Sequence, residues 1–332
     1  MELLKKLIPP AIFLLFVLVA VEISFRIYTA GVAAVDPRRM HSMNTLMRSE
    51  FVQLSEYPDV FFELKPDMDG WFRGVPFATN SRGLVDQEYS LQKPEGTRRI
   101  VVTGSSWTMP AGVKEADAWH AVLERQLNEG QPEQPVEVVN FGVEMYGLRE
   151  IIATIRRKAL QWEPDLIVAA VTPYTGTIVW EPEDQPQYLP ERAYPGFESY
   201  TLAALRSMLG LPGKAPKNDR RRHSGGDQAV LEQLQRALDE LSLLQSETKV
   251  PAVMLFLGYF PLEKFDATLR EYADEKGVKL LHGNRIFPLD AEERNEYQIS
   301  NFDRHPNERG HQAIADFVAE EVRTRSLLES AD

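Results

Sequence analysis

The feature that most constrains the fold of this chain is a regular alternation of short apolar segments with longer amphipathic ones. The apolar segments, each of strand length, lie at 98–103, 136–140, 165–171, 251–257 and 277–281. The segments with helical spacing lie near 117–129, 148–161, 228–246, 261–275 and 308–323. Short apolar strands that alternate with helices are typical of a parallel sheet covered on both faces. The pattern therefore predicts an α/β fold, a three-layer sandwich with a central parallel sheet.

Two polar residues stand where helices of this pattern begin. Asp117 opens the first helix and Asn307 precedes the last. Short polar side chains at such positions accept hydrogen bonds from backbone N–H groups of the first helical turn. In the last helix, apolar residues recur at spacings of three and four, as in Ile314, Phe317 and Val318, which predicts one buried face.

The segments outside the alternation divide the chain into three parts. We expect a membrane anchor at 1–27, a lead-in at 28–95 that packs on the domain, and the α/β domain at 96–332. The lead-in is expected to hold a short helix at 40–54. The proline-rich stretch at about 181–226 is too long for an ordinary connection, so we treat it as an insertion. Its arginine run is either a solvated charged segment, a lid or a docking surface.

An apolar run from residue 7 to residue 25 is interrupted by a single charged residue, Glu22. This length suits a helix that spans a membrane better than a helix of a soluble core. Pro9 and Pro10 fit the first turn of such a helix, where a missing N–H costs little. We therefore predict one uncleaved membrane helix at 7–25.

The charges before this run predict its orientation. Lys5 and Lys6 precede it, and basic residues mark the cytoplasmic side of a membrane helix. The globular part is therefore expected outside the cytoplasm. The alternative is a signal peptide that is cleaved after Ala33.

Composition excludes several classes of protein. The chain has 332 residues and a net charge of −12, whereas nucleic-acid binding and binding to anionic lipid need a basic surface. The absence of cysteine excludes disulfides and thiolate metal sites. Five histidines lack the spacing of a metal motif: His41, His120, His223, His282 and His311. We expect neither a metal nor a cofactor.

Two short segments at opposite ends of the α/β pattern supply the parts of one catalytic site. Ser106 lies in GSSWT at 104–108, directly after the first strand of the alternation. Asp303 and His305 lie in DRHPNERGH at 303–311, at the start of the last helix. A histidine that takes the hydroxyl proton and a carboxylate that orients the imidazole activate a serine for nucleophilic attack. We predict that the three side chains converge at the carboxyl end of the sheet.

These segments resemble the SGNH hydrolase (GDSL esterase-like) superfamily, in particular its membrane-anchored bacterial members. The segment 104–108 is similar to the family block Gly-Asp-Ser-Phe-Thr, and 80–84 (NSRGL) is similar to a segment that precedes the first strand in relatives. The resemblance covers about 60–330 and implies Ser106 as nucleophile, His305 as base and Asp303 as its partner. It also implies a flavodoxin-like fold and a periplasmic domain held on the bacterial inner membrane.

Two blocks depart from the family pattern around the oxyanion hole. The resemblance implies that backbone N–H groups near Gly142 bind the oxyanion, but Met145 stands where the family has a glycine. Tyr174 stands where the family has an asparagine that donates from its side chain. The loss of one such donor costs about 10²–10³ in turnover. We therefore expect Tyr174 to line the site and catalysis to be weak.

Two classes of function follow. The first is a membrane-anchored serine esterase or acyl-transfer enzyme, with an O-acylated glycan or another envelope ester as substrate. The second is a catalytically inactive SGNH-like domain that serves as a structural or interaction subunit of a membrane protein complex. The retained serine, aspartate and histidine favour the enzyme, and the changed blocks favour the inactive subunit.

Overall fold

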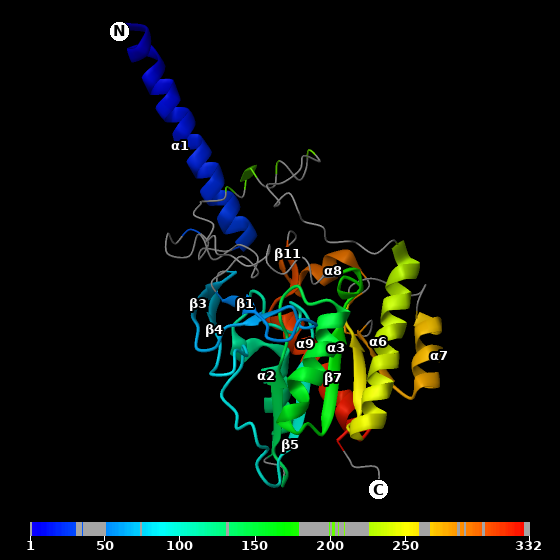
Figure 1. Ribbon diagram of the computed structural model, residues 1–332. Helices are drawn as coiled ribbons and strands as arrows, with labels where there is room; N and C mark the ends of the chain where they lie inside the picture. The colour runs from blue at the N-terminus through cyan, green and yellow to red at the C-terminus, as the bar shows by residue number, and fades with distance from the viewer. Residues whose placement is uncertain are drawn as a thin grey trace.

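The computed structural model describes residues 2–30, 35, 51–73, 75–130, 133–178, 199, 201–202, 205, 209, 226–258, 266–283, 286–288, 290–300 and 303–328. Its main body is a parallel sheet with helices on both faces, as the alternation in the sequence predicts (Figure 1). The expected insertion at 181–226 lies almost entirely outside the described residues.

The five strands of this sheet are those that the apolar segments predict, to within two residues at each end. They are β5 (Arg98–Thr103), β6 (Val136–Asn140), β7 (Leu166–Val171), β8 (Ala252–Phe256) and β9 (Lys279–His282). All neighbours are parallel, and the order in the sheet is β6-β5-β7-β8-β9. The direction of winding reverses between β5 and β7, and open α/β sheets bind ligands at such a point, beyond the carboxyl ends of the strands.

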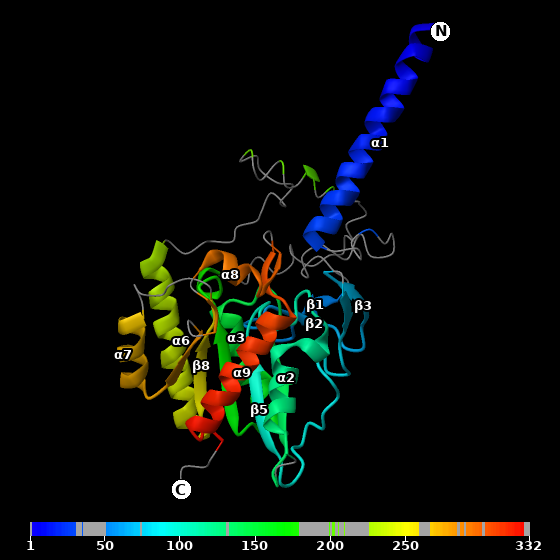
Figure 2. The same cartoon turned by 180° about the vertical axis from the view of Figure 1, so that it is seen from behind.

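Helices cover the sheet in two layers (Figure 2). One layer consists of α2 (Trp119–Leu127) and α9 (Glu308–Thr324), and the other of α3 (Leu148–Arg157), α6 (Gly226–Thr248) and α7 (Asp266–Lys276). Side chains of β5 alternate between the two cores, because successive residues of a strand point to opposite faces. Ile100 and Val102 pack with α2 and α9, whereas Val101 packs with α3 and α6.

One of the two expected helix caps is present. Asn307 precedes α9 and its side chain accepts a hydrogen bond from the Gly310 N–H at 3.0 Å. The cap predicted at Asp117 is wrong, because this residue ends a short 3-10 turn, Glu115–Asp117. Ala118 then precedes α2 and supplies no side-chain hydrogen bond to it.

The described part of the lead-in forms two β-hairpins. β1 (Val52–Leu54) pairs with β2 (Phe62–Leu64), and β3 (Asp69–Phe72) pairs with β4 (Val75–Ala78). The helix expected at 40–54 is therefore wrong at Val52–Leu54, and its earlier part lies outside the described residues. Aromatic side chains explain the difference, because they are buried in the core shared with α3: Phe51, Phe62, Phe72 and Phe77.

A further short hairpin lies between the last strand of the sheet and α9. α8 (Ala291–Asn295) is followed by β10 (Gln298–Ser300) and β11 (Asp303–Pro306), which pair antiparallel. In Figure 1 these elements lie at the end of the sheet that faces α1.

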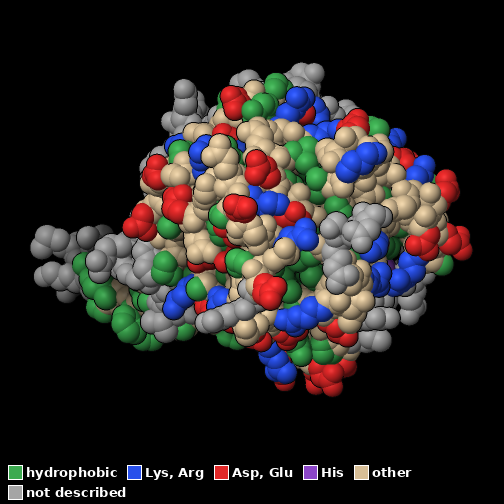
Figure 3. All heavy atoms as spheres, turned by 90° about the horizontal axis from the view of Figure 1, so that it is seen from below, with side chains coloured by type: hydrophobic (Ala, Val, Ile, Leu, Met, Phe, Trp, Pro, Cys, Tyr) green, Lys and Arg blue, Asp and Glu red, His purple; other side chains and the backbone are tan. Residues whose placement is uncertain are grey.

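The N-terminal segment is one continuous helix, α1 (Glu2–Ala30), which projects away from the α/β body (Figure 1). Residues Ile8–Tyr28 are long and apolar enough to cross a membrane, by length and composition. The helix begins earlier than expected, so Pro9 and Pro10 lie inside it rather than in its first turn. Figure 3 shows acidic and basic side chains interspersed on the face of the molecule seen from below.

Candidate active site

Ser106 lies in a tight turn at the carboxyl end of β5. The turn is closed by hydrogen bonds from the N–H groups of Thr108 and Met109 to the Ser105 carbonyl, each at 2.9 Å. A side chain on Gly104 would place its Cβ 2.1 Å from Thr108 Oγ1 and 2.8 Å from the Ala170 carbonyl, so only glycine fits there. The packing between β5, this turn and β7 thus fixes where the serine emerges.

The structure brings Ser106, His305 and Asp303 together, as the sequence predicts. His305 Nε2 lies 2.8 Å from Ser106 Oγ. His305 Nδ1 lies 2.5 Å from Asp303 Oδ1, and the His305 backbone N–H donates to the same oxygen at 3.1 Å. Asp303 and His305 are two residues apart in β11, so their side chains share one face of the strand.

Arg73 supplies a cation beside Asp303, and no pattern in the sequence points to it. Its Nη1 donates to Asp303 Oδ2 at 2.6 Å, and its Nη2 donates to Glu144 Oε1 at 2.7 Å. Burial alone would raise the pKa of Asp303. Hydrogen bonds from His305, together with the charges of His305 and Arg73, outweigh burial and hold the Asp303 pKa well below its usual range. The carboxylate therefore stays ionised beside the imidazole.

Gly142, expected near the oxyanion, lies in the turn after β6. Its N–H donates to Asn140 Oδ1 at 2.8 Å, so this donor is engaged within the turn. A Cβ on Gly142 would lie 2.5 Å from the Met109 nitrogen, which explains why glycine is required. Asn140 also donates from Nδ2 to the Thr108 carbonyl at 3.1 Å, and thereby joins this turn to the turn that carries Ser106.

Met145 stands where the resembled family has a glycine, and its backbone is left-handed. Its φ is +70°, in the left-handed region that favours glycine. Tyr174, the other changed position, is half-exposed, and its hydroxyl lies 4.0 Å from Met145 Sδ. The two residues that depart from the family pattern are therefore in contact with each other.

Ser106 also offers a backbone donor at this end of the sheet. Among the described residues, its N–H makes no backbone hydrogen bond. An N–H beside the nucleophilic oxygen is suited to the negative charge that develops on a carbonyl oxygen during attack.

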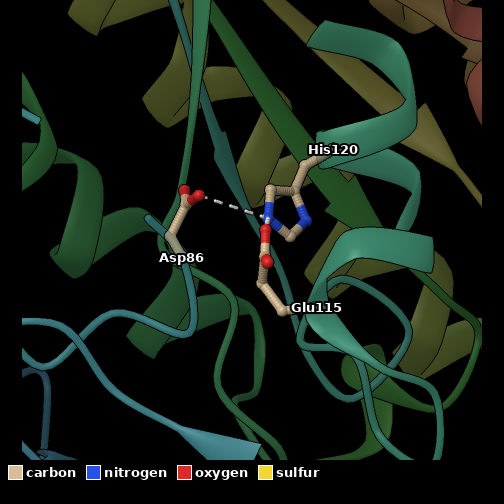
Figure 4. Close-up of side chains that lie close together, drawn as sticks. All are labelled: Asp86, Glu115 and His120. Atoms are coloured by element: carbon tan, nitrogen blue, oxygen red, sulfur yellow. Dashed lines mark ion pairs between the residues drawn. The ribbon is translucent and has the colours of Figure 1, made fainter. Parts of the chain in front are cut away.

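A second cluster of titratable groups lies beside the site (Figure 4). The buried His120 directs its Nε2 toward Asp86 Oδ1 at 3.5 Å and toward Glu115 Oε1 at 3.8 Å. The three side chains have the spacing of metal ligands. A histidine ligand, however, must present an unprotonated nitrogen to the metal.

The hydrogen bonds of Asn140 decide where the proton of His120 lies. Asn140 Nδ2 faces the Thr108 carbonyl and also lies 3.1 Å from His120 Nδ1. Because an amide NH₂ only donates, His120 Nδ1 must be the acceptor, and the ring proton of the neutral imidazole is on Nε2. This proton points at Asp86, whose other oxygen accepts a hydrogen bond from the Asn140 N–H at 2.8 Å, so the cluster helps to hold the turn after β6.

His311, six residues after His305 in the sequence, lies on α9 and is buried. Its Nδ1 accepts a hydrogen bond from the Trp119 N–H at 3.1 Å. Burial lowers the His311 pKa to about 3, so the ring is neutral. It joins α9 to α2 and takes no part in the array around Ser106.

Comparisons with known proteins concern the fold. No family model and no curated protein matches the chain. A protein of the G-D-S-L lipolytic family from Desulfitobacterium hafniense is 16% identical, with 68% of this chain and 99% of that chain covered and a TM-score of 0.42. A psychrotrophic esterase from Pseudoalteromonas sp. is 13% identical, with 69% and 98% covered and a TM-score of 0.43. An acetylxylan esterase from Geobacillus stearothermophilus is 14% identical, with 68% and 94% covered and a TM-score of 0.44.

Proposed function

We propose that this protein is a serine ester hydrolase or acyl-transfer enzyme of the SGNH type. The observation that carries the proposal is the array of Ser106 Oγ, His305 Nε2 and Asp303, linked at 2.8 Å and 2.5 Å beyond the carboxyl end of the sheet. A serine with a base in hydrogen-bond contact, and a carboxylate that orients this base, is the general arrangement of an activated nucleophile.

The geometry supports attack on an ester carbonyl. His305 Nε2 takes the Ser106 proton as Oγ bonds to the carbonyl carbon, and Asp303 stabilises the imidazolium that forms. The imidazolium then protonates the leaving alkoxide, the ester C–O bond breaks, and the acyl group remains on Ser106. Water or an acceptor hydroxyl attacks this acyl-enzyme with His305 as base, and the Ser106 oxygen leaves and regains its proton.

Backbone amides are assigned to the oxyanion because the family asparagine is missing. The Ser106 N–H is the first donor. We assign the Met145 N–H as the second, because Met145 stands at the family's glycine position and has a left-handed backbone, which glycine adopts readily. With no carboxamide at position 174, the expected turnover is low.

The proposed place of action is the periplasmic face of a bacterial inner membrane, with α1 as an uncleaved anchor. The apolar length of Ile8–Tyr28 and the preceding Lys5 and Lys6 support this orientation. An O-acylated glycan or another ester of the envelope is the substrate class that this location favours. Extraction of membranes at alkaline pH should leave the protein in the membrane fraction, whereas release of a form that begins near residue 34 would identify a signal peptide.

The decisive experiment is labelling of the purified full-length protein by a fluorophosphonate probe, which reacts only with an activated serine. Wild-type protein should be labelled, and Ser106→Ala and His305→Ala should not. Hydrolysis of a simple acetate ester should follow the same pattern.

The contact between Met145 and Tyr174 favours a second candidate, a non-catalytic subunit of a membrane complex. A folded wild-type protein that is neither labelled nor active on esters would support this second function and reject the first.

A further inference from the structure

We propose that Arg73 is a positioning residue of the catalytic array. In this inference, which rests on the proposed function, one guanidinium holds Asp303 in place and ties it to Glu144 in the turn that carries Met145. Arg73 thereby fixes the His305–Asp303 pair and the turn that carries Met145 relative to each other.

The contacts of Asp303 show how its orientation is set from two sides. Oδ1 faces His305 Nδ1 at 2.5 Å, and Oδ2 accepts from Arg73 Nη1 at 2.6 Å. The planar guanidinium presents its donors in a fixed fork, so a carboxylate held in this way cannot rotate without breaking a charge-assisted hydrogen bond. Because Asp303 orients His305, the arginine acts on the base through the aspartate.

The second arm of the fork reaches a different part of the site. Nη2 donates to Glu144 Oε1 at 2.7 Å, and the Glu144 side chain is only 4% exposed. Glu144 directly precedes Met145, the residue with the left-handed backbone. Displacement of the arginine would therefore release the aspartate and leave a buried carboxylate without this cation next to the proposed oxyanion donor.

The backbone at Arg73 is an independent observation. Phe72 pairs with Val75, so Arg73 lies in the tight turn between β3 and β4, and its φ is +48°. Turns of this kind favour asparagine, aspartate or glycine, which adopt positive φ at little cost. The chain instead places a large cation there in a strained conformation, and the ion pairs with Asp303 and Glu144 account for it.

This turn provides a variant that separates function from folding. Arg73→Asn places a residue that the turn prefers, so the hairpin should form as well as in the wild type, yet both ion pairs are lost. Arg73→Lys keeps one charge but lacks the fork, so it should restore activity only in part. Arg156→Gln is the matched control, because Arg156 of α3 also bridges two carboxylates, Glu240 and Glu247 of α6, at the surface of the protein.

The measurement is the rate of fluorophosphonate labelling of the full-length protein as a function of pH. Arg73→Asn should label about 10²-fold more slowly, the size of effect that a misplaced catalytic group produces. Its acid limb should also move to higher pH, because the His305–Asp303 pair is easier to protonate without the neighbouring cation. Arg156→Gln should match the wild type in both respects.

A second readout does not depend on activity. The proton between His305 Nδ1 and Asp303 should give a strongly downfield-shifted NMR signal in the wild type, identified by its absence in His305→Ala. The signal should be lost or moved in Arg73→Asn. If it is unchanged, or if labelling and its acid limb equal those of the wild type, the positioning role of Arg73 is wrong. Absence of labelling in the wild type would reject the proposed function, and the NMR comparison would still decide the role of Arg73.

Discussion

At the scale of single residues, two positions bear on how well the proposed site would stabilise negative charge. Met145 and Tyr174 replace the glycine and asparagine of the resembled family, and they contact each other through the hydroxyl and the sulfur at 4.0 Å. Since a phenol can donate to an oxyanion only if its ring finds room, the identity of residue 174 decides whether a third donor is present.

Substitution of Tyr174 should reveal whether its hydroxyl works in this way. Tyr174→Phe should slow ester turnover by less than the ~10² that a well-placed oxyanion donor contributes. Tyr174→Asn should preserve or raise turnover, because a carboxamide restores the donor of the family. Initial rates on an acetate ester check both changes, with Ser106→Ala as the background. Turnover that does not respond to Tyr174→Phe would show that the phenol is not a donor.

Met145→Gly should change activity more than stability. Glycine adopts a left-handed backbone without the steric cost that a side chain adds, so the substitution stabilises the folded state by about 1–2 kcal/mol. The greater freedom of glycine in the unfolded chain costs about 0.4–1 kcal/mol, and the contacts of the partly buried methionine are also lost. The free energy of unfolding should therefore stay nearly constant in a urea titration. Ester turnover should rise because space opens beside the serine, and a fall would mean that the methionine side chain takes part in substrate binding.

At the scale of secondary-structure elements, the start of α3 contains a buried carboxylate. The Glu150 Oε2 accepts a hydrogen bond from the Gly147 N–H at 2.9 Å, and the residue is almost inaccessible to solvent. Burial, which the hydrogen bonds from the Glu150 and Gly147 N–H groups only partly offset, raises its pKa to about 8. The native state thus keeps a proton that the unfolded chain releases near its ordinary pKa.

This proton makes stability depend on pH with a defined sign. From the ordinary glutamate pKa up to about 8, the native state binds more protons than the unfolded state, so stability falls as the pH rises. The slope for one proton is about 1.4 kcal/mol per pH unit. Glu150→Gln retains an oxygen acceptor for Gly147 but cannot ionise, so it should reduce this slope. Urea unfolding of both proteins between about pH 5 and pH 8 tests the prediction, and equal slopes would contradict it.

The sequence predicts the strands of the central sheet better than it predicts the hairpins. Strands β5 to β9 are predictable because each contains a short run of apolar residues, and such runs are buried between the two helical layers of a parallel sheet. The hairpins of the lead-in are not, because strands as short as Val52–Leu54 are stabilised mainly by partners that lie elsewhere in the chain. β11 is missed for the same reason, since its sequence DRHP has no apolar alternation.

Some residues of the candidate site are also predictable from the sequence, and others are not. Ser106, Asp303 and His305 belong to short blocks with a recognisable order, so the sequence predicts their meeting. Arg73 lies 230 residues from the aspartate that it contacts, in a turn with no local signature of catalysis. Only the packing of the hairpin on the domain brings the two together.

At the scale of the whole molecule, we expect the lead-in to be required for activity and α1 to be dispensable. A protein that begins at Phe51 should be labelled by the fluorophosphonate at the wild-type rate, because the described hairpins and the sheet remain intact. A protein that begins at residue 96 loses Arg73 together with the buried aromatic residues of the lead-in, so it should be unstable and unlabelled. Wild-type labelling of the shorter protein would show that residues 51–95 are dispensable.

The distance along the chain between the nucleophile and its base has a consequence for biogenesis. Ser106 and His305 are separated by 199 residues, and every strand of the sheet after β5 lies between them. If the domain is exported across a membrane, as proposed above, the serine reaches the far side first and the histidine much later. During this interval the serine has no base and cannot react with the acyl esters around it, so reactivity would appear only when the last helix has reached the far side and docked on the sheet.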